Sequence, residues 1–458
     1  MSFKVEFSQL AKLTWPLLIA QVTQILMGVS DTIMAGRVSA TDMAAVAIAT
    51  SIVMPILFFI QGVILALPPI ISRLNGGNNL AEIPNKMQQT LWLSLMISLP
   101  LAGCYWIVPK LIGLIPMEAE LNRITFRYVQ FMLVGAPAFA IYQVLRNTCE
   151  GLSLTRPSMI IMGVGLAVNI PANYIFIYGK LGVPAFGGAG CGIATSLVFT
   201  AMMLATWLFT LKSSVLQKYH LYRQWFAPNW QGIWEILHLG VPIAMAILFE
   251  VSLFALVAIL LSPFGAVIVA AHQVALNVSS LMFMVPLSIG MASTIRIGHL
   301  LGQQQPQQAK TAVKSALVFG TCTAAFTATF SFVLRYPIAN LYSTDAVVIN
   351  MAADLMLLAA MFQLSDALQV ISGCALRGYK DTKAMFYITF FSYWVIGLTT
   401  GCVLGLTDWL VPKMAAKGFW IGFIVGLTSA AILLGWRLIY IQRHLHPELY
   451  KNDQQALS

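Results

Sequence analysis

The chain has 458 residues, of which 59% are hydrophobic and only 9% are charged. Soluble domains carry about 25% charged residues, so this composition excludes an ordinary soluble domain and indicates an integral membrane protein. The net charge of +10 does not indicate nucleic-acid binding, because the basic residues concentrate in loops on one predicted side of the membrane.

The apolar runs predict an all-α membrane protein with about twelve spanning helices, each long enough for a bilayer core of roughly 30 Å. The run from Leu13 continues too far for a cleavable signal and predicts the first span. The predicted spans lie near residues 11–34, 44–71, 90–109, 128–146, 158–178, 190–211, 240–262, 267–292, 315–334, 353–376, 384–406 and 418–440.

The distribution of Lys and Arg predicts the orientation in the membrane. With both termini cytoplasmic, few basic residues face outward, among them Arg37, Lys180 and Arg335. An excess of basic residues on the inner side is the positive-inside rule, and we expect a multi-pass membrane protein with cytoplasmic termini. The basic residues of the predicted inner loops include Lys212, Lys218, Arg223, Lys310, Lys314, Arg377, Lys380 and Lys383.

The first acid inside a predicted span is Asp31, in the sequence QILMGVSDTIMAG. In the fifth span, Asn169 and Asn173 are four residues apart and share a helix face, and Pro171 distorts the backbone between them. A carboxylate with amide oxygens and freed carbonyls suits Na⁺ or a proton. Alternatively, the asparagines only satisfy the backbone that Pro171 interrupts, and the residues alone leave both interpretations open.

The chain partly repeats itself. At an offset of about 226 residues, Pro16 falls on Pro242 and the Ala44-Ala45 pair falls on Ala270-Ala271. An even number of spans separates the copies, so we expect a parallel repeat: two pseudo-symmetric six-helix lobes, residues 1–225 and 226–458, around a central cavity. The polar segment 212–235 is the predicted cytoplasmic linker between them.

Two further acids lie in predicted spans of the second lobe: Glu250, in AMAILFEVSLFALVAILL, and Asp366, in LLAAMFQLSDALQVISG. An acid at the centre of a spanning helix costs roughly 2.5–3.5 kcal/mol, and no Lys or Arg lies inside these spans as a partner. Two carboxylates in a dry cavity cannot both ionise cheaply, so a shared proton or a cation such as Na⁺ is expected there. The alternative is that each acid only pairs with a neighbouring helix.

Polar and aromatic residues near these acids are candidates for the cavity wall. Gln273 and Asn277 form a polar stripe on the eighth span, which either lines the cavity or bonds to neighbouring helices. Phe283 could hold an organic cation against its ring. Acids in an aromatic, Met-rich wall would suit lipophilic organic cations.

Several kinds of chemistry have no sequence signal. The chain has no P-loop, GxSxG, HExxH or CxxC pattern, and its six cysteines are scattered. We therefore expect no enzyme activity, no cofactor and no ATP hydrolysis. An ion gradient would have to drive transport.

The chain resembles the multidrug and toxic compound extrusion (MATE) family, and within it the NorM-like bacterial branch. The motifs that carry the resemblance span nearly the whole chain. They are DTIMAG from Asp31, ATDMAAVAIATSI from Ala40, CEGLSLTRP from Cys149, NIPANYIFIYG from Asn169, the tract around Glu250, AHQVALNVSSLMF from Ala271 and LRGYKDT from Leu376.

This resemblance implies a protein of the bacterial inner membrane that exports cationic amphiphilic drugs and dyes in exchange for Na⁺ or H⁺, with drug resistance as the outcome. By position, the family's essential acids correspond to Asp31, Glu250 and Asp366, and its asparagines to Asn169 and Asn173. An outer-loop acid that contacts substrate in relatives corresponds to Asp345. The expected partners are cationic organic molecules, the coupling ion and the bilayer, and a single two-lobed chain is expected to act as a monomer.

Three alternatives make different predictions. A drug exporter coupled only to H⁺ would use the same acids. A flippase for lipid-linked substrates would need basic residues in the cavity to hold a phosphate, whereas this sequence places acids there. A membrane-embedded prenyl-type transferase would need an Asp-rich motif such as DDxxD for Mg²⁺, which the sequence lacks.

Overall fold

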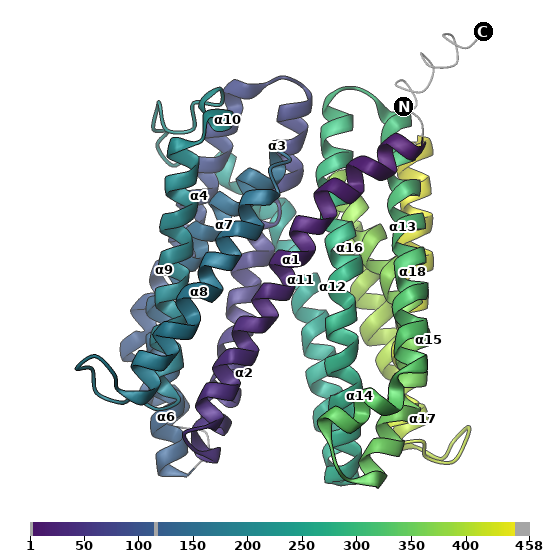
Figure 1. The fold of residues 1–458 in the computed structure, drawn as a ribbon. Helices are drawn as coiled ribbons and strands as arrows, with labels where there is room; N and C mark the ends of the chain where they lie inside the picture. The colour runs from purple at the N-terminus through teal and green to yellow at the C-terminus, as the bar shows by residue number, and fades with distance from the viewer. Residues whose placement is uncertain (1–2, 114–117, 445–458) are drawn as a thin grey trace. The chain divides into compact units, whose positions relative to one another are not determined.

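The computed structural model describes residues 3–113 and 118–444, and all regular secondary structure in these ranges is helical (Figure 1). The helices form two compact units. One unit is Ile19–Ala244, and the other joins Met1–Leu18 to Met245–Ser458. These limits come from contacts in space, whereas the division at residues 225 and 226 came from the sequence repeat and stays a prediction.

The predicted membrane-spanning character agrees with the helices. Within the described residues, ten helices are long and apolar enough to cross a membrane, and an eleventh span arises if α6 and α7, which are bent by 45°, count as one. The predicted span 90–109 falls mostly on α4, Ile83–Gly103. This helix is not among the ten, because its first turns carry Lys86, Gln88 and Gln89.

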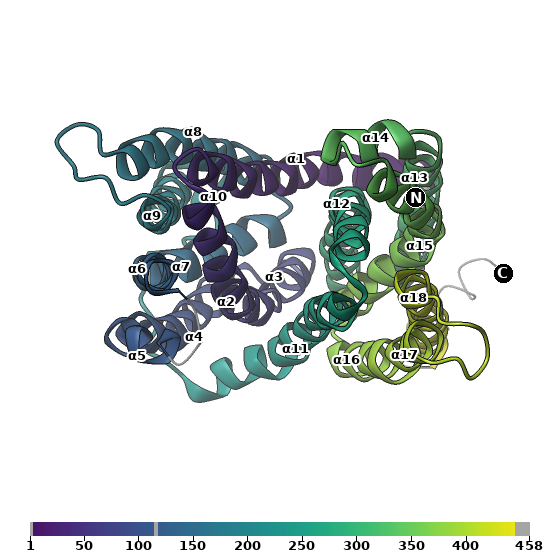
Figure 2. The same cartoon turned by 90° about the horizontal axis from the view of Figure 1, so that it is seen from below.

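The unit Ile19–Ala244 contains the second part of α1 and the first part of α11. In this unit α8 packs along α9, and α7 packs on both α4 and α9 (Figure 2). The helices are α1 Phe3–Gly36, α2 Ala40–Ile64, α3 Leu67–Gly76, η1 Leu80–Glu82, α4 Ile83–Gly103, η2 Cys104–Trp106, α5 Val108–Ile112, α6 Ala119–Val134, α7 Ala136–Gly151, α8 Arg156–Tyr178, α9 Ala189–Lys212, α10 Ser214–Gln217 and α11 Trp230–Leu261.

The other unit contains the start of α1, the rest of α11 and all later helices. Its centre is α15, which packs against α12, α13 and α18. The helices are η3 Ser262–Phe264, α12 Ala266–Gly302, α13 Pro306–Val333, α14 Arg335–Tyr342, α15 Ala346–Gly378, α16 Thr382–Phe390, the π-helical turn η4 Phe391–Gly397, α17 Leu398–Leu406 and α18 Ala416–His444.

Both unit limits lie inside long helices. Leu18 is the last residue of the first segment in α1, and Ala244 is the last residue of the other unit in α11. These positions are separated by the offset that relates Pro16 to Pro242, and each proline stands two residues before its limit. The sequence repeat is therefore matched in the structure, because α1 and α11 change from one unit to the other at equivalent positions.

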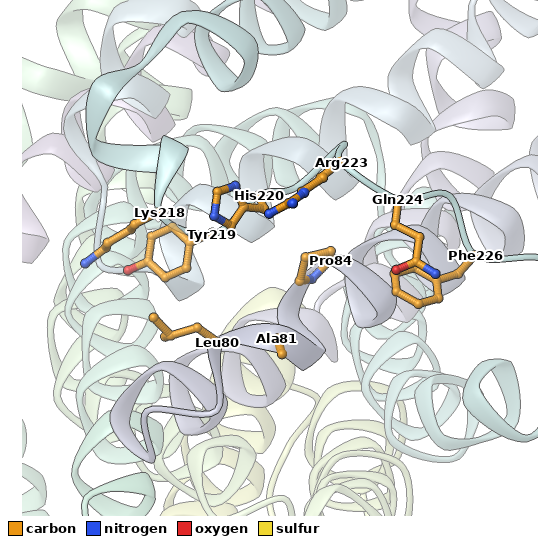
Figure 3. A pocket seen from close by; sticks show the side chains of 9 residues that line it. All are labelled: Leu80, Ala81, Pro84, Lys218, Tyr219, His220, Arg223, Gln224 and Phe226. Atoms are coloured by element: carbon orange, nitrogen blue, oxygen red, sulfur yellow. The ribbon is translucent and has the colours of Figure 1, made fainter.

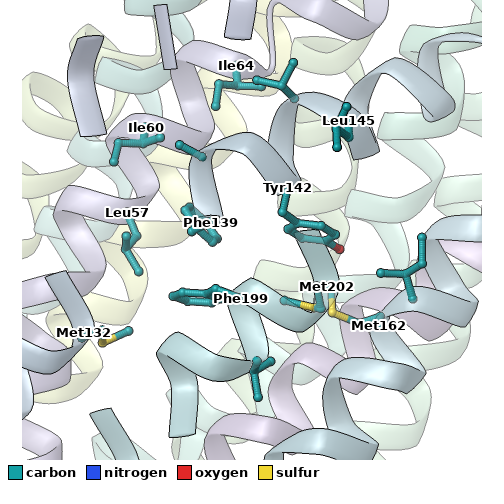
Figure 4. Close-up of a cluster of buried hydrophobic side chains, with 14 of the residues drawn as sticks. Leu57, Ile60, Ile64, Met132, Phe139, Tyr142, Leu145, Met162, Phe199 and Met202 are labelled. Carbon is teal, nitrogen blue, oxygen red and sulfur yellow. The ribbon is translucent and has the colours of Figure 1, made fainter. Parts of the chain in front are cut away.

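Buried side chains of mixed shape fill the core of Ile19–Ala244. Phe139 on α7 meets Phe199 on α9 with ring centroids 4.8 Å apart, and Met132, Met162 and Met202 pack around them (Figure 4). The flexible Met side chains fill the gaps that rigid rings leave. This packing fixes α6, α7, α8 and α9 relative to one another, and α6, α8 and α9 carry partners of Asp31.

Candidate functional site

Asp31 lies at the centre of a buried polar cluster in the unit Ile19–Ala244. Its carboxylate oxygen Oδ1 accepts hydrogen bonds from Asn169 Nδ2 at 2.9 Å and from Asn173 Nδ2 at 2.6 Å. Asn169 is 2% exposed and Asn173 is fully buried. The structure thus brings together the acid and both asparagines that the sequence singled out, although the residues come from helices far apart in the chain.

The geometry of α8 explains how both amides reach one carboxylate. Asn169 and Asn173 are one helical turn apart, and Asn173 also donates to Asn169 Oδ1 at 3.3 Å. Pro171, inside α8, has no N–H, so the carbonyl of Ala167 loses its helical donor. The side-chain oxygen Oδ1 of Asn173 is buried without a hydrogen-bond partner, which leaves an oxygen acceptor free beside the carboxylate.

Other helices complete the cluster around Asp31. Thr195 on α9 donates to Asp31 Oδ2 at 3.5 Å, and the Cys191 thiol donates to the Asp31 carbonyl at 3.6 Å. The buried Tyr128 on α6 lies close enough to feel the charge of Asp31, and its hydroxyl accepts from Thr50 on α2. The sequence analysis did not identify Thr195, Tyr128 or Thr50, because no spacing links them to Asp31.

A second acidic cluster lies in the other unit. Asp366 on α15 is buried, Glu250 on α11 is partly buried, and the two carboxyls are close enough for their charges to interact. Arg377, which the sequence analysis assigned to an inner loop, belongs to the last turn of α15, and its charge acts on Glu250. Two acids and one cation therefore share one electrostatic environment.

Tyr393 joins this second cluster and was not predicted. It lies in the π-helical turn Phe391–Gly397, is buried, and interacts electrostatically with both Glu250 and Asp366. Its hydroxyl has no hydrogen-bond partner. Single π-helical turns inside helices are frequent at functional sites, and this one places a phenol hydroxyl beside two acids.

The remaining predicted residues lie in other settings. Gln273 donates to Asn277 at 3.1 Å, and both side chains are exposed. Phe283 is partly buried and packs on the apolar cluster that contains Leu10 and Leu17. Asp345 is exposed and caps α15 by accepting from the Val347 amide at 2.8 Å.

Asp345 is distant from the acid pair along its own helix. At 1.5 Å per residue, the helix places it roughly 30 Å from Asp366. The structure thus assigns Asp345 a structural role at the N-terminus of α15 and does not bring it to Glu250 and Asp366. Among the described residues, no group of three or more His, Cys, Asp or Glu side chains could hold a metal ion.

The fold and these two acid clusters define a multi-pass membrane transporter. The MatE family model matches residues 16–175 and 242–403, once in each copy of the repeat. The multidrug resistance protein NorM of Aliivibrio fischeri is 48% identical over 442 residues, which cover 96% of each chain. MdtK of Pectobacterium atrosepticum is 48% identical over 442 residues, 96% of this chain and 97% of that one.

The fold agrees with solved structures of transporters. The eukaryotic MATE transporter AtDTX14 matches with a TM-score of 0.87 and 21% identity over 99% of both chains. A MATE solved in complex with MaL6 matches with a TM-score of 0.86 and 20% identity over 96% of this chain and 97% of that one. The chain belongs to the MatE family, which confirms the resemblance and the fold class predicted from its sequence.

Proposed function

We propose that this chain is a multidrug efflux antiporter of the bacterial inner membrane, which exports cationic amphiphilic drugs and dyes in exchange for Na⁺ or H⁺ by alternating access. Membership of the MatE family and the NorM and MdtK relatives support export of drugs. The observation that carries the coupling is the buried carboxylate of Asp31 between two buried asparagines.

The cluster around Asp31 has the chemistry of a site for a small cation. Na⁺ prefers hard oxygen ligands, as do other hard cations, and the cluster offers the Asp31 carboxylate, the Thr195 hydroxyl and the unpartnered Asn173 oxygen. A proton would instead bind the carboxylate directly. Either ion removes the net charge of the cluster, which is the step that coupling requires.

The acid pair Glu250 and Asp366 supplies the second part of the proposal. A cation, organic or inorganic, offsets the repulsion between two acids in one buried environment. Phe249, next to Glu250, packs against Phe390 with ring centroids 4.9 Å apart and against Trp394 at 5.8 Å. Carboxylates beside aromatic faces are suited to bind lipophilic organic cations. The coupling ion and the drug are both cations that the negative charge of Glu250 and Asp366 attracts. In this proposal only one of them neutralises that charge at a time.

Energetics limits how the exchange can be driven. An exchange of one monovalent cation for another moves no net charge, so only the concentration gradient drives it, at about 1.4 kcal/mol per tenfold. A second coupling ion would add roughly 2.3 kcal/mol per 100 mV of membrane potential.

The proposal is tested by ethidium efflux in proteoliposomes, with Na⁺ and pH gradients imposed separately. We expect efflux under at least one gradient, and loss of that efflux in Asp31→Asn, Glu250→Gln and Asp366→Asn. Asp345→Asn serves as a control acid, because Asp345 caps a helix outside both clusters. Efflux driven by the pH gradient alone would assign H⁺ as the ion.

The flippase alternative is tested in the same vesicles. A fluorescent lipid-linked phosphate should stay in its leaflet while ethidium moves. Translocation of that lipid, with no ethidium efflux under either gradient, would overturn the drug-exporter proposal.

A further inference from the structure

A basic pocket opens on the unit Ile19–Ala244, and none of its lining residues belongs to either acid cluster. It encloses about 520 Å³ between the start of α4 and the connection that follows α9. The connection lies along one side, and Leu80 and Ala81 lie on the other (Figure 3). Its lining residues are Leu80, Ala81, Pro84, Lys218, Tyr219, His220, Arg223, Gln224 and Phe226.

The charge of the pocket is positive. Lys218 and Arg223 are exposed at its wall, His220 lies between them in sequence, and none of the lining residues is acidic. The carboxylate of Glu82, next to the lining residue Ala81, accepts from Asn79 Nδ2 at 3.0 Å. Burial raises the pKa of the neighbouring Tyr222 to about 12, so this phenol adds no negative charge. The pocket therefore favours an anion.

The wall that carries these cations is fixed rather than loose. The buried Gln88 donates to the carbonyls of Leu221 and Gln224 at 3.1 and 2.8 Å, and accepts from the Phe226 amide at 2.8 Å. Gln89 binds the connection in the same way, at Ala227 and Asn229. Because the backbone is held in place before a ligand arrives, little ordering cost remains at binding.

Tyr219 anchors the same wall of the pocket in the protein core. Tyr219 is buried and donates from its hydroxyl to Asn75 Oδ1 at 3.0 Å. The Lys218 ammonium lies 4.8 Å from the centre of the Tyr219 ring. This contact places the Lys218 ammonium beside the buried ring at the pocket wall.

The surroundings of the pocket suit a lipid. Leu80, Pro84 and Phe226 supply apolar lining, and the nearby side chains of Trp225 and Trp230 are each 65% exposed. Exposed tryptophans are typical of the membrane–water interface. The charge pattern of the sequence predicts that this face is cytoplasmic, where the inner leaflet carries anionic lipids.

We propose that this pocket binds a phosphate group through Lys218 and Arg223, with Gln224 as a hydrogen-bonding neighbour. The phosphodiester of an acidic phospholipid such as phosphatidylglycerol would present both the charge and the acyl chains that the lining accommodates. Soluble phosphate shares the charge but not the acyl chains, so experiments can separate the two sources.

The test is native mass spectrometry of the full-length protein in detergent, titrated with phosphatidylglycerol or phosphatidylcholine, with and without inorganic phosphate. We expect retained phosphatidylglycerol to fall in the Lys218→Gln/Arg223→Gln variant by roughly fivefold per cation removed, from about 1 kcal/mol per basic residue near a lipid surface. Lys212→Gln removes an exposed cation from the end of α9, outside the pocket, and should leave retention unchanged.

Each outcome bears on the proposal. A lipid ligand is supported if only the pocket variant loses phosphatidylglycerol and if inorganic phosphate does not lower the retention of this lipid by the wild type. Displacement by inorganic phosphate at the same residues supports the phosphate site and assigns it to a soluble ligand. Equal retention in wild type and the pocket variant, or an equal loss in Lys212→Gln, overturns it. The variants replace exposed side chains, and an unchanged unfolding temperature confirms that they fold.

Discussion

At the scale of single residues, Asn173 is the most informative partner of Asp31, because it is fully buried and makes the shorter of the two amide contacts. Asn173→Ala removes a hydrogen bond to a charged group, worth about 1.5–3 kcal/mol. We predict that the ion concentration for half-maximal efflux shifts by roughly 10- to 100-fold. It rises for Na⁺, which loses the Asn173 oxygen, and falls for H⁺, because the ionised carboxylate loses a hydrogen-bond donor. Varying Na⁺ or pH in the efflux assay measures the shift.

A matched control for this change lies in the same unit. Asn147 is also buried, and its amide donates to the Gln143 carbonyl of its own helix at 2.7 Å. Asn147→Ala should lower stability by a similar amount without the same change in ion requirement. An equal change in both variants would mean that Asn173 acts only through folding.

Tyr393 allows function and stability to be separated. Its hydroxyl is buried without a hydrogen-bond partner, so Tyr393→Phe removes a polar group whose burial costs free energy. We predict an unfolding temperature that is unchanged or higher, together with at least a several-fold loss of efflux, because the polar hydroxyl that interacts electrostatically with both acids is removed. A less stable variant with normal efflux would count against a role for Tyr393 in the acid cluster.

At the scale of elements, an ion pair anchors the start of α1. The Arg296 guanidinium on α12 donates to both carboxylate oxygens of Glu6, from Nε to Oε2 at 2.8 Å and from Nη2 to Oε1 at 2.7 Å. The Glu6 side chain is fully buried. Breaking a buried ion pair by removing one partner costs about 3–5 kcal/mol. We predict that Glu6→Gln lowers the unfolding temperature markedly, as measured by a thermal scan of the purified protein.

The comparison for this anchor is the pair Arg123 and Glu120, whose side chains are about half exposed. Exposed pairs contribute below about 1 kcal/mol, so Glu120→Gln should leave the unfolding temperature nearly unchanged. Similar shifts in both variants would show that the Glu6 pair is not the anchor of α1.

The start of α11 packs on α2 through contacts that only glycine permits. A Cβ at Gly240 would lie 2.2 Å from the carbonyl oxygen of Val63, and one at Gly62 would lie 2.5 Å from Ala244 Cα. We predict that Gly240→Ala destabilises the protein, whereas Gly163→Ala, with open space around it, stabilises it by up to about 1 kcal/mol. Chemical unfolding of both variants measures the sign, and a stabilised Gly240→Ala would contradict this packing.

At the scale of the whole molecule, the acids and the repeat could be predicted, but much of their surroundings could not. Asp31, Glu250 and Asp366 stand out because a charge is costly in an apolar span. The partnership of Asn169 with Asn173 follows from helical spacing. Thr195, Tyr128 and Tyr393 reach the acids only through tertiary packing, which leaves no periodic signal in one sequence.

Two features of the fold also could not be predicted from the pattern of polar and apolar residues. The polar first turns of α4 look unsuited to a membrane span, yet Gln88 and Gln89 are buried because they bind the connection 221–229. The change of unit inside α1 and α11 depends on contacts of helices far apart in sequence. Hydropathy predicts that a helix exists, whereas its partners follow from packing.

The most direct test of the central claim, ion coupling at Asp31, runs the transporter in reverse. In proteoliposomes an ethidium gradient should drive Na⁺ or H⁺ the opposite way, measured as ²²Na⁺ flux or as an internal pH change. We predict counter-movement in wild type and in Asp345→Asn, and none in Asp31→Asn. Ion movement that persists in Asp31→Asn, or its absence in wild type, would contradict the account.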